Sequence, residues 1–509
     1  MTHYKKIKVF IAAALLSFSV MGCSGSEEPA AESSASEEKV EFIPTVIGTY
    51  EAESGEFTGN VSVSYDETGA SGGSFVSGFK NDEDSCLLHV EITENGFYDL
   101  YFSTRASDRK ENYVRVDGNS LGTVVTSEKK FTESAIKRVY LEQGSHTVTV
   151  SKYWGWIDLD YLKITTSEPI EQSFYQVSAE LVNQNATDNT KRLMSYLADQ
   201  YGTNILSGQF CDTGMNGKEF YLIRKATGKT PAVLGLDFIE YTPSRVANGS
   251  SSRATDLAIQ FWENGGIVTF CWHWNAPEKY LTGNWYSGFY SDSTNIDLAK
   301  IMNGKDEEGY ELLMRDIDAI AKQLLILQDA GVPVLWRPLH EASGGWFWWG
   351  DSGAEAYIQL YRLLYDKLTN EYQLNNLIWV WNGQNKDWYP GDEYVDIIGE
   401  DIYPGEKVYT SQVNKYLEAS AYTDRKKMVV LSENGCLFDP ALAVRDGAMW
   451  GFWCTWGGEF VAKPSAIYAY SEQYTEESAL IQFYENEAVI TLDEIPDLTQ
   501  YPIREELQK

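Results

Sequence analysis

Short apolar runs alternate with amphipathic stretches through residues 175–509. Such alternation is typical of βα units that build a parallel sheet. Eight units in roughly 330 residues predict a (β/α)8 TIM barrel with loop insertions. The intervening stretches with helical periodicity include residues 188–201, 256–264, 311–330, 354–372 and 476–484. The candidate strands are residues 204–209, 232–237, 267–274, 332–341, 376–381, 395–403, 428–433 and 448–456.

Polar and aromatic residues, rather than apolar ones, occupy the predicted C-terminal ends of these strands. Catalytic groups lie at this end of the strands in barrels of this kind. The side chains gathered there are candidates for a functional site. They are Gln209, Asp237, His273, Trp274, His340, Glu341, Asn382, Asp401, Tyr403, Glu433 and Trp456.

Two glutamates at strand ends suggest a reaction. Glu341 ends the fourth predicted strand and Glu433 the seventh, and these strands face each other across the barrel mouth. Two carboxyl groups placed so can reach the ~5–5.5 Å separation of a retaining glycosidase. Ionised Glu433 would attack the anomeric carbon, while protonated Glu341 would donate to the leaving oxygen and then act as base for water. The charge of Glu433 would raise the pKa of Glu341.

Aromatic residues crowd the chain just beyond Glu341. A glycine pair is followed by Trp346-Phe347-Trp348-Trp349. A carbohydrate-cleaving site needs a carboxyl group for proton transfer beside flat rings that hold sugars. The alternative is a buried strand end with a salt-bridged glutamate and a tryptophan cluster in the core, which is a costly way merely to pack a core.

The charge balance limits the possible partners. A net charge of −33 argues against nucleic acid or an anionic membrane surface as a partner. It favours a neutral partner such as a polysaccharide, although an acidic surface could also simply keep an exported protein soluble. The aromatic content of 14% suits sugar binding or a large core.

The N-terminal residues have the features of an export signal. Lysines precede an apolar run at residues 9–20, which is too short to span a membrane. The run ends at Cys23 in a sequence that resembles a bacterial lipobox, so residues 1–23 are interpreted as a lipoprotein signal peptide. Ordinary cleavage nearby would instead leave a free cysteine. Residues 24–46 are expected to form a disordered acidic tether. We therefore expect a lipoprotein anchored to the bacterial cell envelope, facing the surface, with no other membrane contact.

Residues 47–166 change to short alternating strands separated by Gly, Asn and Asp. Many short strands in so few residues predict an all-β, jelly-roll-like sandwich. Residues 167–187 are expected to be a linker and residues 188–509 the barrel. The five cysteines other than Cys23 show no CxxC spacing, so neither a zinc site nor a disulfide framework is indicated and most are expected to be buried thiols.

The sandwich segment resembles carbohydrate-binding modules of the family 35 and family 6 type. The resemblance rests on Tyr50-Glu51-Ala52-Glu53, on Gly72-Gly73-Ser74-Phe75-Val76, and on Trp156-Ile157-Asp158-Leu159-Asp160-Tyr161-Leu162. It implies that Glu51, Glu53 and Asp160 bind a structural calcium ion, and oxygen ligands suit such a hard cation. The alternative is that they are solvated strand ends. Sugar stacking would fall to Tyr153, Trp154 or Trp156.

The barrel segment resembles glycoside hydrolase family 26, most of whose members are endo-β-1,4-mannanases. The most specific match is Arg337-Pro338-Leu339-His340-Glu341 with its Trp346-Phe347-Trp348-Trp349-Gly350 tail. Four further matches occur in the right order, at Ser207-Gly208-Gln209, Trp272-His273-Trp274, Ile397-Ile398-Gly399-Glu400-Asp401-Ile402-Tyr403-Pro404 and Ser432-Glu433. The resemblance spans about residues 200–460.

The family resemblance implies roles for individual residues. Glu341 would be the acid/base and Glu433 the nucleophile, with Tyr403 hydrogen-bonded to Glu433. His340 would contact the sugar beside the reacting bond, and Trp346 would shape the positive-side subsite.

Four more residues complete the expected substrate-binding group. His273 and Trp456 would line the negative-side subsites, and Trp274 and Arg337 are placed in the same group. The aromatics could instead belong to the core. Arg337 could support the carboxylates or form a simple buried ion pair.

Two departures from the family pattern leave the sugar open. Ala342-Ser343-Gly344 follows the acid/base, where many members have Met-Asn-Gly, and Gly457-Gly458 follows the last-strand Trp, where many have Arg. We expect a retaining endo-β-1,4-mannanase that acts on mannan, galactomannan or glucomannan as a monomer and needs no cofactor for catalysis. Mixed-linkage β-glucan or xylan as substrate, or a non-catalytic glycan-binding lipoprotein, are the alternatives.

Overall fold

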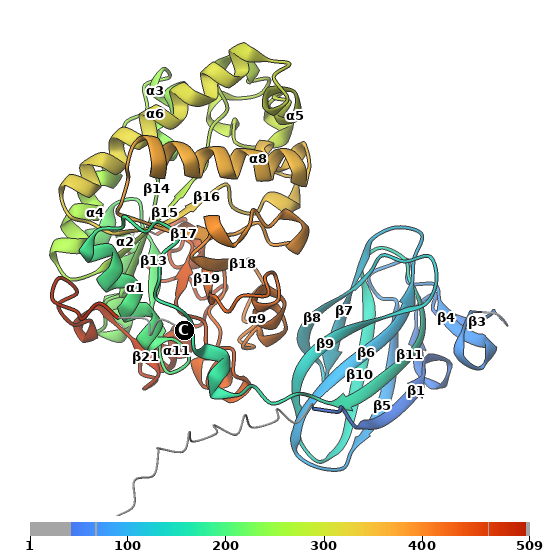
Figure 1. Ribbon diagram of the computed structural model, residues 1–509. Helices are drawn as coiled ribbons and strands as arrows, with labels where there is room; N and C mark the ends of the chain where they lie inside the picture. The colour runs from blue at the N-terminus through green and yellow to red at the C-terminus, as the bar shows by residue number, and fades with distance from the viewer. Residues whose placement is uncertain (1–41, 67–68, 467, 505–509) are drawn as a thin grey trace, which may run out of the picture. The chain divides into compact units, whose positions relative to one another are not determined.

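The computed structural model describes residues 42–66, 69–466 and 468–504. The expected signal peptide, Cys23 and nearly all of the expected tether lie outside these residues, so those expectations stay predictions. No helix in the described part of the chain is both long and apolar enough to cross a membrane. A strand-rich segment comes first in the chain and a mixed segment of strands and helices follows (Figure 1).

The first segment is a sandwich of two antiparallel sheets, which confirms the all-β prediction. The turn at Asp117 and Gly118 joins two strands of one sheet, and both residues have positive φ, at 50° and 80°. One sheet contains β1 (Val46–Glu51), β3 (Ser62–Tyr65), β4 (Ser74–Ser77), β6 (Gly96–Arg105), β9 (Thr132–Leu141) and β11 (Asp158–Thr166). The other contains β2 (Glu56–Thr58), β5 (Ser85–Ile92), β7 (Lys110–Val116), β8 (Asn119–Thr126) and β10 (Gly144–Trp154).

The second segment contains a closed barrel of parallel strands, which confirms the (β/α)8 prediction. Each strand pairs with the next in the sequence, and the last returns to the first through Gln209 and Thr455. The barrel strands are β13 (Gly208–Phe210), β14 (Val233–Asp237), β15 (Ile267–Trp272), β16 (Val334–Pro338), β17 (Leu377–Trp381), β18 (Ile397–Ile402), β19 (Met428–Asn434) and β20 (Trp453–Thr455). A small parallel pair, β12 (Ile205–Leu206) with β21 (Val489–Ile490), adjoins the barrel.

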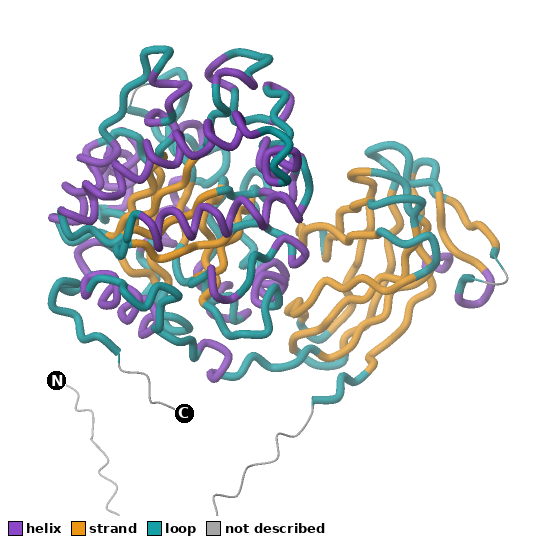
Figure 2. The backbone as a smooth tube through the Cα atoms, turned by 45° about the horizontal axis from the view of Figure 1, so that its top comes forward, coloured by secondary structure: helices purple, strands orange, loops and turns teal. Residues whose placement is uncertain are grey.

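Helices surround the barrel strands (Figure 2). The predicted helix at residues 354–372 is an α-helix that continues into a π-helical turn at Asp366–Glu371. The helices are α1 (Asp188–Gln200), α2 (Lys218–Thr227), α3 (Pro243–Val246), α4 (Ala254–Glu263), α5 (Leu298–Met302), α6 (Glu307–Asp329), α7 (Trp348–Asp351), α8 (Ala354–Tyr365), α9 (Val413–Ser420), α10 (Pro440–Asp446) and α11 (Glu477–Tyr484).

Part of the expected linker belongs to the barrel instead. Tyr175, Val177, Ala179 and Leu181 are all buried in the hydrophobic core of the barrel segment. Burying a large apolar side chain typically contributes about 1.5–3 kcal/mol. The prediction of a linker at residues 167–187 is therefore wrong for its second half, where alternate apolar residues cover the barrel. The five described cysteines are free and buried.

Candidate active site

Three carboxyl groups meet at the C-terminal ends of the barrel strands. Glu341 follows β16, Asp401 lies near the end of β18, and Glu433 lies near the end of β19. Each offers an oxygen, and the three oxygens lie within 4.8 Å of one another. This spacing fits the roughly 5–5.5 Å of a retaining glycosidase and not the roughly 6.5–9.5 Å of an inverting one.

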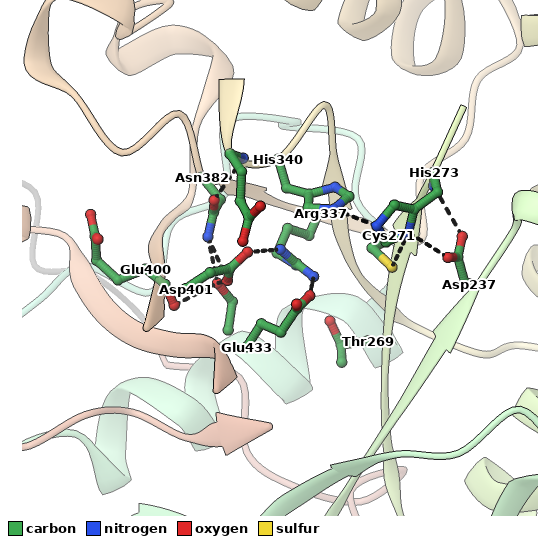
Figure 3. Close-up of polar contacts among 12 residues, drawn as sticks. Asp237, Thr269, Cys271, His273, Arg337, His340, Asn382, Glu400, Asp401 and Glu433 are labelled. Carbon is green, nitrogen blue, oxygen red and sulfur yellow. Dashed lines mark hydrogen bonds and ion pairs between the residues drawn. The ribbon is translucent and has the colours of Figure 1, made fainter. Parts of the chain in front are cut away.

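Glu433 is held by a hydrogen bond to each of its oxygens. The hydroxyl of Tyr403 donates to Oε1. Nη2 of Arg337 donates to Oε2 at 2.6 Å (Figure 3). The residue is almost fully buried. Its carboxyl group therefore has a fixed orientation before any substrate binds, which lowers the entropy lost at the reacting centre.

Glu341 leaves β16 through a tight, strained turn. Leu339 and Glu341 both have φ of 53°, in the left-handed region that non-glycine residues rarely adopt. Such residues cost about 1–3 kcal/mol each and cluster at functional sites. The backbone N–H of Glu341 donates to the carbonyl of Asn382 at 2.7 Å, and Nε1 of Trp346 donates to its carboxyl group at 2.9 Å. The strain is thus held in place by bonds that aim the carboxyl group into the barrel mouth.

The surroundings of Glu341 favour its protonated form. Burial raises the pKa of this carboxyl group well above its usual range, and the charges of Asp401 and Glu433 raise it further. The positive charge of Arg337 acts in the opposite direction. A carboxyl group that stays protonated at neutral pH can act as a general acid.

Asp401 joins the two glutamates into one network. A break in register between β18 and β19 pairs Asp401 with Glu433. Nδ2 of Asn382 and the hydroxyl of Ser432 each donate to Asp401 at 2.8 Å. Burial raises the pKa of Asp401, while Arg337 lowers it. Sequence reasoning placed Asp401 at a strand end but gave it no role, because a bulge cannot be read from an apolar run.

Arg337 contacts the carboxyl groups and not the substrate space. Its side chain is fully buried and bonds both Asp401 and Glu433. The prediction that Arg337 binds substrate is therefore wrong. The structure instead shows the alternative, in which Arg337 supports the carboxylates. Removing one partner of a buried ion pair typically costs about 3–5 kcal/mol, so Arg337 also stabilises the barrel mouth.

Two histidines lie edge to face beside the carboxyl groups. The rings of His273 and His340 have centroids 4.5 Å apart at 81°, and their Nε2 atoms lie 3.1 Å apart. His340 is only 1% exposed, and its expected contact with the sugar stays a prediction. Burial and the charge of Arg337 hold its pKa well below the usual range. Of the two histidine side chains, that of His273 is the more exposed, at 12%.

The predicted subsite aromatics divide into exposed and buried rings. Trp346 is 46% exposed and Tyr403 45%, while Trp456 is partly buried against Phe210. Trp274 is fully buried, and its Nε1 donates to Asp316 of α6 at 2.9 Å. The prediction that Trp274 binds substrate is therefore wrong. Side chains alternate along a strand, so the rings on either side of the inward His273 point outward to the helices.

A cavity of about 540 Å³ opens beside His273. Asp212, an exposed residue at its wall, was not predicted from the sequence; partial desolvation in the cavity and then the charge of Asp237 raise the pKa of its carboxyl group to about 6. Sequence reasoning also missed the exposed rings of Trp285, Tyr286 and Tyr290, for which the only signal was an aromatic-rich loop. The cavity is lined by residues that include Asp212, Asp237, Glu240, Arg253, Phe289, Tyr290 and Trp456.

In the sandwich, two of the three expected calcium ligands carry an unsatisfied oxygen, whereas both oxygens of Asp160 accept hydrogen bonds. One oxygen each of Glu51 and Glu53 is buried without a hydrogen-bond partner in the described part of the chain. Burial raises the pKa of Asp160, and the charges of Glu51 and Glu53 raise it further. Asp160 and Glu51 also share Ser71 as a hydrogen-bond donor. A hard divalent cation such as calcium would satisfy the two buried oxygens of Glu51 and Glu53 that lack a donor, and its charge would offset the mutual repulsion of the three carboxyl groups.

Three exposed rings of the sandwich were expected to bind sugar. Tyr153 packs against Tyr113, with ring centroids 4.3 Å apart. Trp154 and Trp156 are exposed to 60% and 61%. Of these two, Trp156 borders a cleft of about 530 Å³, whose other lining residues include Asn60, Ser62, Ser77, Lys80, Arg105, Lys129 and Asp158.

Sequence comparisons agree with this division of the chain. A model of glycosyl hydrolase family 26 matches residues 182–490, and a model of carbohydrate-binding module family 35 matches residues 48–167. The chain is 37% identical to a mannan endo-1,4-beta-mannosidase of Thermothelomyces thermophilus, over 92% of this chain and 94% of that protein. Mannan endo-1,4-beta-mannosidase B of Piromyces sp is 35% identical, over 88% of this chain and 77% of its own length.

Solved structures show the same architecture. A GH26-CBM35 beta-(1,4)-mannanase of Podospora anserina superposes with a TM-score of 0.62 at 37% identity, over 89% of this chain and 99% of that one. A ruminal GH26 endo-beta-1,4-mannanase gives a TM-score of 0.63 at 28% identity, over 87% and 99%. The carboxyl geometry, the family match over most of the chain and these relatives show that this chain belongs to glycosyl hydrolase family 26, with a family 35 carbohydrate-binding module preceding the catalytic barrel.

Proposed function

We propose that this chain is an endo-β-1,4-mannanase that works by a retaining double displacement, with Glu433 as nucleophile and Glu341 as acid/base. The observation that carries the proposal is the carboxyl cluster, whose oxygens lie within 4.8 Å of one another. The choice of mannan follows the relatives, which are named as mannan endo-1,4-beta-mannosidases.

In the first displacement, a carboxylate oxygen of Glu433 attacks the anomeric carbon. The bond from that carbon to the leaving oxygen breaks, and Glu341 gives its proton to the leaving oxygen. Tyr403 and Arg337 hold Glu433 in line for the attack. The charge on Glu433 disappears as the ester bond forms, which lowers the pKa of Glu341 at the moment when Glu341 must lose its proton.

In the second displacement, water replaces the first product. Glu341, now a carboxylate, takes a proton from the water as its oxygen attacks the anomeric carbon. The bond to Glu433 breaks and its carboxylate is restored. Two inversions at one carbon leave the product with the β configuration of the substrate.

The substrate would lie across the barrel mouth. Trp346 donates to Glu341 and is exposed, so it suits the sugar on the leaving-group side. His273 and Trp456 line the cavity of about 540 Å³, whose lining does not include Trp346, and this cavity suits the sugars that become bound to Glu433. Aromatic faces hold sugar rings while polar groups orient them.

The proposal is tested by product release from mannan, galactomannan, glucomannan, mixed-linkage β-glucan and xylan. Short manno-oligosaccharides from the mannans alone are the expected result. Products from glucan or xylan alone would keep the mechanism and change the substrate. No product from any of them would favour a binding protein without activity.

In the module, we propose that Trp156 is the sugar-stacking ring, because it borders the cleft. Replacing Trp156 with alanine should weaken binding to insoluble mannan by roughly 10- to 30-fold, as expected for an aromatic anchor worth about 1.4–2 kcal/mol. The measurement is a depletion isotherm, made in a Glu433→Ala background so that the mannan is not digested. Trp154→Ala is the matched control, since this ring is equally exposed and lies outside the cleft lining. A larger loss from Trp154→Ala would contradict the assignment.

We also propose that Glu51, Glu53 and Asp160 bind calcium. Calcium at 100 times its Kd would stabilise the module by about 2.7 kcal/mol. Removing calcium with EDTA should therefore lower the melting temperature of the module by roughly 10–20 °C. Scanning calorimetry of the full chain measures the change, and Asp160→Asn should abolish the response. No calcium by elemental analysis, together with no effect of EDTA, would contradict the site.

A further inference from the structure

We propose that Asp237 is a positioning residue that fixes which nitrogen of His273 carries a proton and, through His273, which nitrogen of His340 does. The proposal rests on the proposed function, because it assigns Asp237 an effect on the turn that carries Glu341. It adds a third layer to the site, behind the carboxyl groups and the histidines.

The two oxygens of Asp237 have separate tasks. Oδ1 accepts from the backbone N–H of Ile239 at 2.8 Å and from that of His273 at 3.1 Å. Oδ2 lies 2.6 Å from Nδ1 of His273 (Figure 3). Oδ1 therefore fixes the backbone after β14 and at His273, whereas Oδ2 faces the imidazole ring alone.

A carboxylate can only accept hydrogen bonds, so the Nδ1 atom of His273 must carry a proton. In the neutral ring, Nε2 of His273 is then an acceptor. His340 presents its own Nε2 at 3.1 Å, and this atom must donate. Nδ1 of His340 is left with a lone pair, and it is a buried atom without a partner in the described part of the chain.

The opposite arrangement is less favourable. It would place a second proton on His273 and move the proton of His340 to Nδ1, leaving a buried N–H without an acceptor. One arrangement therefore fits both contacts: Nε2 of His340 donates to Nε2 of His273, and Nδ1 of His273 donates to Oδ2 of Asp237. We call this arrangement the chain of protons.

This chain of protons acts on the acid/base through the backbone. His340 stands between Leu339 and Glu341, the two residues with left-handed φ. Its carbonyl accepts from Nε1 of Trp349 at 2.9 Å, and its ring is held by His273. Fixing the ring of His340 therefore helps to hold the strained turn that aims Glu341. Cys271 also lies near, but burial raises the pKa of its thiol well above the usual range, so it remains a thiol in the core.

The test is the Asp237→Asn variant. Asparagine can keep the Oδ1 bonds to the backbone while its NH₂ group replaces Oδ2. The amide then donates to Nδ1 of His273, so the ring proton must move to Nε2 and the proton of His340 must move to its orphaned Nδ1. We expect kcat to fall by about 10- to 100-fold, the range typical of residues that orient a functional side chain, with a smaller change in KM.

The direct readout is ¹⁵N NMR of labelled histidine in the full chain without substrate. The sequence has five histidines, so few signals need assignment, and single replacements of His89 and His146 assist it. In the native protein, Nδ1 of His273 and Nε2 of His340 should be protonated. In Asp237→Asn, both assignments should be reversed, a change that a merely structural role would not produce.

Asp212→Asn is the matched control, because Asp212 lines the same cavity and loses the same carboxyl group. In the described residues it makes no hydrogen bond to either histidine, so both tautomers should stay unchanged. An unprotonated Nδ1 on His273 in the native protein would overturn the proposal even if Asp237→Asn failed to fold. So would a folded Asp237→Asn variant with native tautomers. Failure of the proposed function would appear separately, as hydrolysis that survives Glu433→Ala.

Discussion

Replacing Glu433 with alanine should lower kcat by at least about 10⁴-fold on every polysaccharide that the enzyme cleaves, because loss of a nucleophile removes the covalent route. The variant should still bind mannan, since the exposed ring of Trp346 and the partly buried ring of Trp456 are untouched. It also leaves Arg337 and Tyr403 without one partner, so its stability must be checked by its melting temperature. The measurement is kcat on a soluble mannan, beside an affinity measurement.

Adding a small anion to the Glu433→Ala variant tests directly whether Glu433 is the nucleophile. The methyl group of alanine leaves room at the anomeric carbon, so azide should restore turnover and give a glycosyl azide of α configuration. Glu400→Gln is the matched control, because Glu400 is a buried carboxyl group on β18 that bonds Tyr422 and faces away from the site. Burial raises the pKa of Glu400 to about 8, so it is mostly neutral at pH 7 and glutamine mimics it. Full activity in Glu433→Ala would mean that the nucleophile has been misassigned.

Replacing Glu341 with glutamine should remove both general acid catalysis and one limb of the pH profile. General acid–base catalysis contributes roughly 10²–10⁴-fold, so the loss on polysaccharide should fall in that range. The native enzyme needs Glu341 protonated. Burial and the neighbouring charges raise its pKa, so kcat/KM should stay high at neutral pH and fall as pH rises through that raised value. The glutamine variant should lack this alkaline fall.

Substrates with different leaving groups distinguish a catalytic role of Glu341 from a structural one. An aryl mannoside with an acidic phenol needs no proton to leave, so Glu341→Gln should form the glycosyl-enzyme from it at nearly the native rate. Hydrolysis of that intermediate should be slow, since the base is missing. Asp401 is the competing acid, because burial raises its pKa as well. An alkaline limb that persists in Glu341→Gln and disappears in Asp401→Asn would transfer the role to Asp401.

The barrel and its two glutamates could be predicted from the sequence because the signals are local. Apolar runs mark buried parallel strands, and the residue that ends such a run lies at the mouth whatever the helices do. Glu433 follows from that rule because it lies near the end of β19, whereas Glu341 was expected at a strand end and lies in the turn that follows β16. The order of the strands follows as well, since successive βα units pair in sequence in this fold.

The remaining features depend on details that a pattern does not contain. Trp274 points to the helices because β15 ends at Trp272 and leaves His273 facing inward. His340 is buried because the turn after β16 adopts positive φ at two non-glycine residues. Asp401 reaches Glu433 through a register break between two strands. A shift of one residue reverses the face of a side chain, and neither a register break nor a left-handed turn can be recognised in a pattern of apolar residues.

The measurement that tests the central claim most directly is the anomeric configuration of the first product. Proton NMR of native enzyme acting on manno-oligosaccharide follows the new reducing end before it mutarotates. The close carboxyl cluster predicts that the β anomer forms first and the α anomer appears later by mutarotation. An α anomer formed first would show inversion through a water molecule, and it would contradict both the assigned nucleophile and the double displacement.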